Sequence, residues 1–388
     1  MTADRKSKIA IVGAGPAGSG LAIYLAQAGF KTVLIEREKF PREKLCGEFI
    51  SPECIAHFQQ LGVLEEMLAA GGEQISETRF FETGGKSITV PSDWFGGGNF
   101  ALGLSRAEMD HQLLMRAKAV GVEVREETSV TAIEKEHDGS VGKLVARTND
   151  GTLTEIAADI YVDATGRAGI LSKLADKNDA DHRTVKNKPG FVGFKAHLAN
   201  TDLEQSCCEI YSFPGGYAGL SNVENSLANL CFLVKSEIVR STGDANAIVK
   251  KVVCRNRRAQ QTLKNFSAAE NWLAVSITGF GTKKPAPLRN LFTVGDAASF
   301  IDPFTGSGMV MALESARVLA DVTIANAAAP EMIASEYLRA YRQTFSRRLR
   351  VCSVLRRTAF MPRLATVVVS ALSLSSNARR LLARATRR

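Results

Sequence analysis

The sequence predicts an α/β protein with a doubly wound, Rossmann-like lobe, a second lobe built on an antiparallel sheet, and a helical C-terminal extension. Three observations predict this fold class. An apolar strand at 9–12 runs into a glycine turn and a helix, and a second apolar strand at 291–294 ends in Gly-Asp. Between 189 and 280, long strands follow one another with little helix between them. Strands alternating with helices favour a parallel sheet, whereas successive strands favour an antiparallel one.

The first element is the strand–turn–helix unit that contains the run GAGPAG at 13–18. Gly13 permits the sharp turn, Gly15 leaves room for a phosphate beside the main chain, and Gly18 lets the helix pack on the strand. We expect the helix over 17–28, ended by Gly29. A turn of this kind holds a dinucleotide pyrophosphate on backbone N–H groups. The alternative is a glycine turn without a ligand.

The next strand, 31–36, closes on an acidic residue. Glu36 lies 18 residues beyond Gly18, close to the place where a carboxylate accepts hydrogen bonds from an adenosine ribose. Far downstream, Gly295-Asp296 is followed by Pro303-Phe304-Thr305-Gly306-Ser307-Gly308. A chain that binds only NAD has no need of this second segment. Together the two segments indicate the two ends of a bound FAD.

The remaining elements divide the chain between two lobes and an extension. Ser105 with Glu108 predicts a capped helix start. Strands are expected at 122–124, 130–135 and 158–163, with hairpins at Asp138-Gly139 and 149–151. The antiparallel sheet is expected from strands 191–198, 209–213, 227–234 and 272–278, with one helix near 243–264. We assign residues 1–75, 103–185 and 285–335 to the FAD-binding domain, 76–102 and 186–284 to the substrate domain, and 336–388 to the extension.

The C-terminal extension carries the basic charge of the chain. Residues 337–388 contain thirteen arginines and no lysine, aspartate or glutamate, and the rest of the chain has more acidic than basic residues. The apolar run 365–372 is shorter than the ~20 residues needed to span a bilayer. It predicts a core or oligomer contact, or a segment lying on a membrane surface. The arginines predict contact with an anionic membrane or an acidic carrier protein. The alternative is a packed C-terminal helix whose arginines are solvated. No aromatic residues alternate with the arginines, which argues against nucleic acid.

Cysteines, histidines and glycines exclude several classes. Seven cysteines without a CxxC pair indicate reduced thiols in a cytoplasmic setting, with a peripheral membrane location as the alternative. Five scattered histidines predict no metal site. No second GxGxxG follows a strand, so NAD(P)H is expected as a transient electron donor rather than as the ligand of its own domain.

Several runs together resemble a known family. They are GAGPAG at 13–18, FPREKLCGE at 40–48, Arg106 with Asp110, DATG at 163–166, YSFPGGY at 211–217 and GDAASFIDPFTGSG at 295–308. They are similar to FAD-dependent oxidoreductases of the para-hydroxybenzoate hydroxylase fold, and within it to the geranylgeranyl reductase-like branch. The resemblance spans roughly residues 8–325. It implies a tightly bound FAD, with the substrate between the substrate sheet and the flavin ring.

The resemblance also implies roles for individual residues. Asp296 would accept hydrogen bonds from the flavin ribityl chain, and Arg106 would bind the pyrophosphate. The helix starting near Met309 would point its positive end at the flavin ring. Asp163 would be a flavin-side aspartate or a strand-end turn former. The full set of implied cofactor-binding residues is Gly13, Gly15, Pro16, Ala17, Gly18, Glu36, Arg37, Lys44, Cys46, Gly47, Arg106, Val130, Asp163, Gly166, Gly295, Asp296, Pro303, Gly306, Ser307, Gly308 and Met309.

Four residues are candidates for catalysis: Cys46, Glu48, Tyr211 and Tyr217. Cys46 would lie near the flavin, either as a reactive thiol or as a packing contact. Glu48 departs from the reductase pattern, which has a further glycine there; it predicts a structural acid or a base on the substrate side.

Two activities follow from the resemblance. In the first, a monooxygenase hydroxylates an aromatic or lipophilic small-molecule substrate, including a carrier-bound one, with NAD(P)H and O₂. In the second, an FAD-dependent reductase adds hydrogen to a C=C bond of a prenyl or lipid-like chain. A third alternative is a non-catalytic flavoprotein that acts as a binding module. The Trp-x-Trp-x-Ile-Pro stretch typical of flavin halogenases is missing, since the chain has only Trp94 and Trp272.

Overall fold

The computed structural model describes residues 7–176, 190–278, 280–300, 306–359 and 375–385. Its first lobe is built on a five-stranded parallel sheet in the order β20-β12-β1-β2-β8. Apart from the edge strand β8, these short strands are mostly apolar because both faces of the sheet are covered. Their bounds are β1 Lys8–Val12, β2 Lys31–Ile35, β8 Glu123–Arg125, β12 Ile160–Asp163 and β20 Leu291–Thr293.

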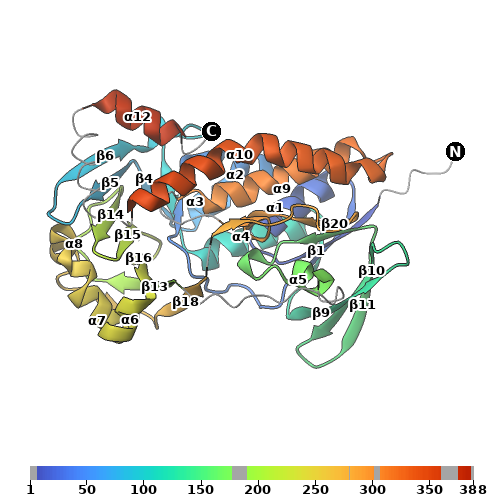
Figure 1. Ribbon diagram of the computed structural model, residues 1–388, viewed down its shortest axis with the longest axis horizontal. Coiled ribbons are helices and arrows are strands. Elements are labelled where there is room, and N and C mark those ends of the chain that lie inside the picture. Colours follow the sequence, from blue (N-terminus) through green and yellow to red (C-terminus); the bar gives the residue numbers. More distant parts are fainter. Residues whose placement is uncertain (1–6, 177–189, 279, 301–305, 360–374, 386–388) are drawn as a thin grey trace.

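Helices cover one face of the parallel sheet and strands cover the other (Figure 1). Ile9 and Ile11 point into the helical side, whereas Ala10 and Val12 point to the opposite side, as the two-residue period of a strand requires. The helices are α1 Pro16–Gln27, α2 Pro52–Leu61, α3 Leu64–Ala69, α4 Arg106–Ala119, α9 Gly308–Ala325 and α10 Ile333–Ala359. The opposite side holds the antiparallel strands β9 Thr128–Lys135, β10 Val141–Thr148 and β11 Leu153–Ala157, with the short helix α5 Ile170–Asp176.

The second lobe is an eight-stranded sheet in the order β17-β13-β16-β15-β14-β5-β6, with β18 also paired to β13. It is antiparallel except where β14 runs parallel to β5. Strands β5 and β6, which come from the segment 76–102, are part of this sheet. The bounds are β5 Glu77–Phe81, β6 Ser87–Pro91, β13 Phe191–Ala199, β14 Cys207–Phe213, β15 Gly216–Asn222, β16 Ala228–Lys235, β17 Ser267–Ala268 and β18 Leu273–Ile277.

Small sheets join the two lobes. Strands β3 Phe49–Ile50 and β4 Glu73–Ile75 both pair with β7 Ala101–Gly103, and β19 Gly281–Thr282 pairs with β21 Ser299–Phe300.

The mixed α/β fold class is confirmed, but one predicted helix is wrong and one strand was not predicted. The single helix near 243–264 is broken into α7 Ala245–Lys251 and α8 Arg257–Thr262, preceded by α6 Ser236–Thr242. The side chains of Asp244 and Asn256 cap the N-termini of α7 and α8. Because an N-cap residue has a non-helical backbone, a continuous helix cannot run through either position. Strand β15 was not expected at all. The glycines that hide it are required there, since a Cβ on Gly216 would lie 2.2 Å from the carbonyl oxygen of Leu233.

The start of the C-terminal extension packs against the first lobe. Tyr337, Tyr341 and Phe345 of α10 are buried in the helical core. The Tyr337 hydroxyl donates to the carbonyl oxygen of Thr293, at 2.8 Å. A second helix, α12 Ser376–Ala385, lies against β6 (Figure 1). The apolar run 365–372 lies outside the described residues. Among the described residues, no helix is both long and apolar enough to cross a membrane.

Candidate functional site

One large cavity, of about 1160 Å³, is lined by both lobes. Most residues predicted to hold the cofactor or the substrate reach it, although they come from stretches far apart in the sequence. Those that line it are Gly13, Gly15, Pro16, Ala17, Glu36, Arg37, Lys44, Cys46, Gly47, Glu48, Arg106, Val130, Gly166, Tyr217, Gly295, Asp296, Gly306, Gly308 and Met309.

The glycine turn places the start of α1 at the edge of this cavity. No side chain caps the helix N-terminus, and its first turn carries no acidic residue, so its N–H groups and positive dipole end are free to meet an anion. A Cβ on Gly15 would meet only the Arg106 side chain, at 3.8 Å. In contrast, a Cβ on Gly18 would lie 1.8 Å from the carbonyl oxygen of Gly13. Gly18 therefore serves the packing of helix on strand and does not line the cavity.

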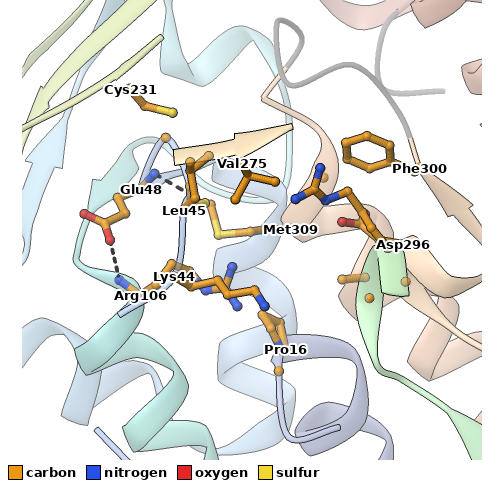
Figure 2. Close-up of a pocket in the computed structure, with 18 of the residues that line it drawn as sticks. Pro16, Lys44, Leu45, Glu48, Arg106, Cys231, Val275, Asp296, Phe300 and Met309 are labelled. Carbon is orange, nitrogen blue, oxygen red and sulfur yellow. Dashed lines mark hydrogen bonds between the residues drawn. The ribbon is translucent and has the colours of Figure 1, made fainter. Parts of the chain in front are cut away.

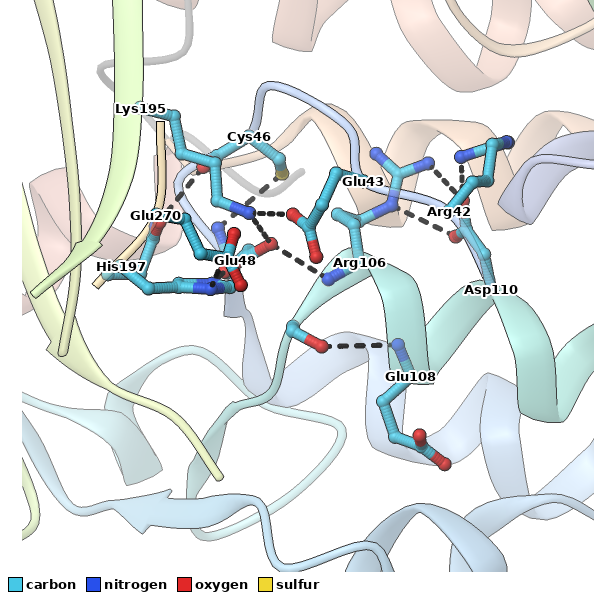
Figure 3. Close-up of polar contacts among 12 residues, drawn as sticks. Arg42, Glu43, Cys46, Glu48, Arg106, Glu108, Asp110, Lys195, His197 and Glu270 are labelled. Atoms are coloured by element: carbon cyan, nitrogen blue, oxygen red, sulfur yellow. Dashed lines mark hydrogen bonds and ion pairs between the residues drawn. The ribbon is translucent and has the colours of Figure 1, made fainter. Parts of the chain in front are cut away.

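Basic side chains gather opposite this turn. Arg106 makes a two-pronged contact with Asp110, with Nε and Nη2 donating at 2.9 and 2.7 Å, and Arg42 donates to the same carboxylate at 3.0 Å (Figure 3). Burial opposes the charged form of Arg106, but Asp110 outweighs it and raises the pKa of Arg106. Burial, together with Arg42 and Arg106, lowers the pKa of Lys44. Lys44 points across the cavity toward Pro16 (Figure 2). The cluster therefore has an excess of positive charge that a bound anion would offset.

Glu36 follows the last residue of β2 and lies beside the same turn. One carboxylate oxygen accepts from the N–H of Ala14 at 2.8 Å and the other from the N–H of Glu38 at 3.1 Å. The carboxylate is thus held at the cavity wall in a fixed orientation, as an acceptor for ribose hydroxyls would need to be.

Asp296 lines the far part of the cavity, close to the start of α9 (Figure 2). Burial raises the pKa of Asp296 to about 6, and Arg167 and Arg106 act against that rise. The Arg167 guanidinium lies over the Phe300 ring, 5.1 Å from its centre. Gly306, Gly308 and Met309 bring the α9 N-terminus to the cavity without bulk.

Three further predicted site residues, Asp163, Ser307 and Tyr211, do not line the cavity. Both oxygens of Asp163 are used by Thr165 and Ser172, so Asp163 holds the strand end and α5 instead of lining the cavity. Ser307 is fully buried at the N-cap of α9. Tyr211 lies on the other face of the substrate sheet, in the core against α7 and α8, and donates to Glu209 at 2.6 Å. This corrects the prediction that Tyr211 faces the substrate. Pro303 lies outside the described residues.

Cys46 and Glu48 lie where the two lobes meet. The fully buried Glu48 accepts from the Arg106 N–H at 2.8 Å and pairs with Lys195 at 2.8 Å and His197 at 2.7 Å (Figure 3). Its φ of 51° is a conformation that non-glycine residues rarely adopt. The Cys46 thiol lies beside the Arg106 guanidinium. Glu48 thus fastens β13 of the substrate sheet to the start of α4, which agrees with the structural alternative for this residue.

The sequence did not reveal several members of this junction. Lys195 is almost fully buried and also pairs with Glu43. Glu43, His197 and Glu270 bring one ligand atom each within 4.8 Å of one another, but Lys195 already supplies positive charge there. Lys195 and His197 alternate along an ordinary strand, so only the fold shows that both point at Glu48.

Three features of the cavity fit an FAD molecule. The uncapped α1 N-terminus and the basic cluster suit a pyrophosphate, Glu36 suits a ribose, and the glycine-rich start of α9 leaves room for a flat ring beside Asp296. A sequence comparison agrees, because the family described as "FAD binding domain" matches residues 6–343. The chain belongs to this family. The predicted FAD and the expected para-hydroxybenzoate hydroxylase fold are both supported.

Curated relatives are distant and diverse. The flavin-dependent halogenase gsfI of Penicillium aethiopicum is 27% identical over 84% of this chain and 66% of its own length. The menaquinone reductase of Mycolicibacterium smegmatis is 25% identical over 91% of this chain and 86% of its own length. The chain spans less than two thirds of the length of the conditioned medium factor receptor 1 of Dictyostelium discoideum and of several halogenases that it matches. These likenesses support an FAD-dependent oxidoreductase.

Solved structures share the fold. The flavin-dependent brominase Bmp2 superposes with a TM-score of 0.80 at 19% identity, over 97% of this chain and 93% of that one. A geranylgeranyl bacteriochlorophyll reductase-like protein from Thermoplasma acidophilum superposes with a TM-score of 0.77 at 21% identity, over 98% and 96%. At these identities the likeness concerns the fold alone.

Proposed function

We propose that the protein is an FAD-dependent monooxygenase that hydroxylates an aromatic or lipophilic substrate with NAD(P)H and O₂. The observation that carries this proposal is the continuity of the cavity. The phosphate-facing turn at Gly13–Gly15 and the apolar face of the substrate sheet line the same space. An apolar molecule on that face would therefore lie against the flavin end of the cofactor.

FAD, when bound, would pass electrons from NAD(P)H to O₂, so that one oxygen atom enters a C–H bond and the other leaves as water. The chain's own residues bind and orient. Arg106 and Lys44 would hold the pyrophosphate, and the α9 N-terminus would stabilise negative charge near the ring. Ile210, Val275 and Ile277 line the substrate side and would keep water away from the reacting carbon.

A second candidate is the reduction of a C=C bond, with a hydride and a proton added across it. The match to menaquinone reductases over most of both chains favours this candidate. Cys46 and Tyr217, which both line the cavity, would be the proton donors to test. The halogenases named among the relatives are not a third candidate, because the chain lacks the Trp-x-Trp-x-Ile-Pro stretch.

Oxygen dependence separates the two candidates. Purified, FAD-loaded protein would be mixed with NADH or NADPH and a panel of alkylphenols and polyunsaturated chains, with and without O₂. A monooxygenase should consume the nucleotide in a substrate-stimulated manner and form product only with O₂. Product formed equally well without O₂ would replace the monooxygenase by the reductase.

The arginine-rich extension would deliver such a substrate. Arg342, Arg347 and Arg350 are exposed on the outer side of α10, while Tyr341 and Phe345 anchor its inner side. This arrangement suits an anionic membrane surface that holds a lipophilic substrate, or an acidic carrier protein. NAD(P)H and a cytoplasmic or membrane-peripheral location belong to the same proposal.

A further inference from the structure

A continuous row of side chains crosses the substrate sheet along the floor of the cavity. Cys231, Gly219, Ile210, Phe80 and Ile88 are register neighbours on β16, β15, β14, β5 and β6, and all five line the cavity. Neighbouring strands lie about 4.8 Å apart, so the row is about 19 Å long. Its members are apolar or small. The floor thus suits an extended apolar body rather than a compact ring.

The two ends of this row differ. At the β16 end, Cys231 lies near the flavin side, since the neighbouring Asn229 donates to the carbonyl oxygen of Cys46 at 3.1 Å. At the β6 end, Arg379 of α12 reaches into the cavity. Its Nη1 lies 3.5 Å from the carbonyl oxygen of Thr89, the residue after Ile88.

The positive charge of Arg379 has few interactions that stabilise it at this position. Its guanidinium lies over the Trp94 ring at 6.0 Å, and none of the residues that the structure describes forms a hydrogen bond with its buried Nε. Within the described part of the chain, no carboxylate forms an ion pair with it. A half-buried cation beside an apolar surface is costly unless a counter-charge is present. A guanidinium binds a carboxylate through two parallel hydrogen bonds.

We propose that the substrate is a long amphipathic acid, with its carboxylate on Arg379 and its apolar body along the floor toward Cys231. The inference rests on the proposed function only for the identity of this cavity as the substrate site. Beyond the proposed function, it specifies that the substrate is long and carries a charged group at one end. The acid group is held far from the flavin, and the reacting carbon belongs to the opposite end.

Binding can be measured on the FAD-loaded protein without turnover. The probes are hexadecanoic acid and its methyl ester, titrated by calorimetry below the concentrations at which they aggregate. The acid should bind at least about tenfold more tightly than the ester, because only the carboxylate can accept two charge-assisted hydrogen bonds from the guanidinium. Arg379→Ala and Arg379→Gln should remove that preference and leave ester binding unchanged.

Arg380 and Arg384 provide matched controls, because both are exposed on the same helix. Arg380→Ala and Arg384→Ala should keep the preference for the acid. The proposal is overturned if acid and ester bind equally, if neither binds, or if the control variants lose as much as Arg379→Ala. Because no oxygen chemistry is involved, a failed hydroxylation assay with binding intact would remove the proposed reaction and keep the substrate class.

Discussion

Gly15 and Gly18 belong to one turn, but a side chain added at each position would meet different neighbours. A side chain at Gly15 meets open space next to Arg106, whereas one at Gly18 meets the main chain of Gly13. We therefore expect Gly15→Val to leave the thermal stability of the FAD-free protein nearly unchanged and to abolish FAD binding, read as loss of the yellow colour on reconstitution. Gly18→Ala should instead destabilise the FAD-free protein. A Gly15→Val protein that still binds FAD would contradict the assignment of this turn to the pyrophosphate.

Replacing Glu48 should strongly lower the free energy of unfolding. Glu48→Gln leaves the buried Lys195 and His197 without their shared anion, and removing one partner of a buried pair costs about 3–5 kcal/mol. Urea unfolding should show that loss. Glu270→Gln is the control, because its side chain is half exposed and 3.8 Å from His197, and it should cost under about 1 kcal/mol.

The pH dependence of the Glu48 variant follows from His197. Burial lowers the pKa of His197, but Glu48 outweighs it, so the pKa is raised overall. The stabilisation by the charged imidazole is fully present below about pH 6.5 and is lost as the pH rises through the raised pKa. The deficit of Glu48→Gln should therefore be largest at low pH. If the stability lost in Glu48→Gln instead grows as the pH rises, the charged His197 is not stabilised by Glu48.

Asp296 should shape the acid side of the stability curve in the same direction as His197, because its pKa is also raised in the folded protein. With its pKa raised by burial to about 6, the folded FAD-free protein keeps a proton that the unfolded chain releases near about pH 4. The native state binds more protons between these values, so this carboxyl makes stability fall as pH rises from about 4 to about 6. Asp296→Asn should remove that contribution in thermal melts across this range. Unchanged melts would mean that Asp296 is ionised throughout.

At the residue scale, the motifs predicted most of the first-lobe residues that line the cavity. Short motifs, in which the residue types and their spacing predict the structure, contain Gly13, Gly15, Glu36 and Asp296. The junction around Glu48 could not be predicted in this way, because Lys195 comes from a strand far along the chain and nothing local marks it as buried. Tyr211 was misplaced for a simpler reason: a one-residue change of register puts a strand side chain on the opposite face.

At the element scale, α10 and α12 serve different purposes although both belong to the arginine-rich extension. Tyr337, Tyr341 and Phe345 bury α10 in the first lobe, and each such side chain contributes about 1.5–3 kcal/mol. A chain ending at Met332 should therefore unfold or fail to accumulate. A chain ending at Arg357 keeps this buried face, so it should bind FAD and remain folded.

The same truncation after Arg357 tests the proposed partner of the extension. Full-length protein should co-sediment with anionic vesicles in a salt-sensitive manner, since each basic residue near such a surface contributes about 1 kcal/mol. The truncated protein should bind less while FAD binding persists. If the full-length protein binds neither anionic vesicles nor an acidic carrier protein, the arginines are merely solvated. Neutral vesicles are the control.

Element boundaries followed local signals where these were strong. Ser105 caps α4 as expected and accepts from the Glu108 N–H at 3.1 Å. Strand β15 could not be predicted from its own sequence, because its glycines are poor strand formers. These glycines are needed because neighbouring strands leave no room for a side chain, and the local sequence does not show those neighbours. The break between α7 and α8 depends on Asn256, whose side-chain amide also donates to the carbonyl oxygens of Phe81, Glu82 and Ser212.

At the scale of the whole molecule, the fold joins two surfaces that the sequence keeps far apart. The parallel sheet presents a phosphate cradle and the mixed sheet presents a long apolar floor, and Glu48 fastens one to the other. The para-hydroxybenzoate hydroxylase fold could be expected from the motifs. The length of the floor and the presence of Arg379 at its end could not, because they arise from strand register and from a helix beyond the matched family region.

The fate of molecular oxygen tests the proposed activity most directly. FAD-loaded protein would be supplied with NAD(P)H, ¹⁸O₂ and long-chain acids that carry a phenolic or unsaturated end, and the products would be weighed by mass spectrometry. Monooxygenation predicts product that contains one ¹⁸O atom and does not form when O₂ is excluded. Product that gains two hydrogens and no ¹⁸O, at the same rate without O₂, would contradict the proposal and establish a double-bond reductase.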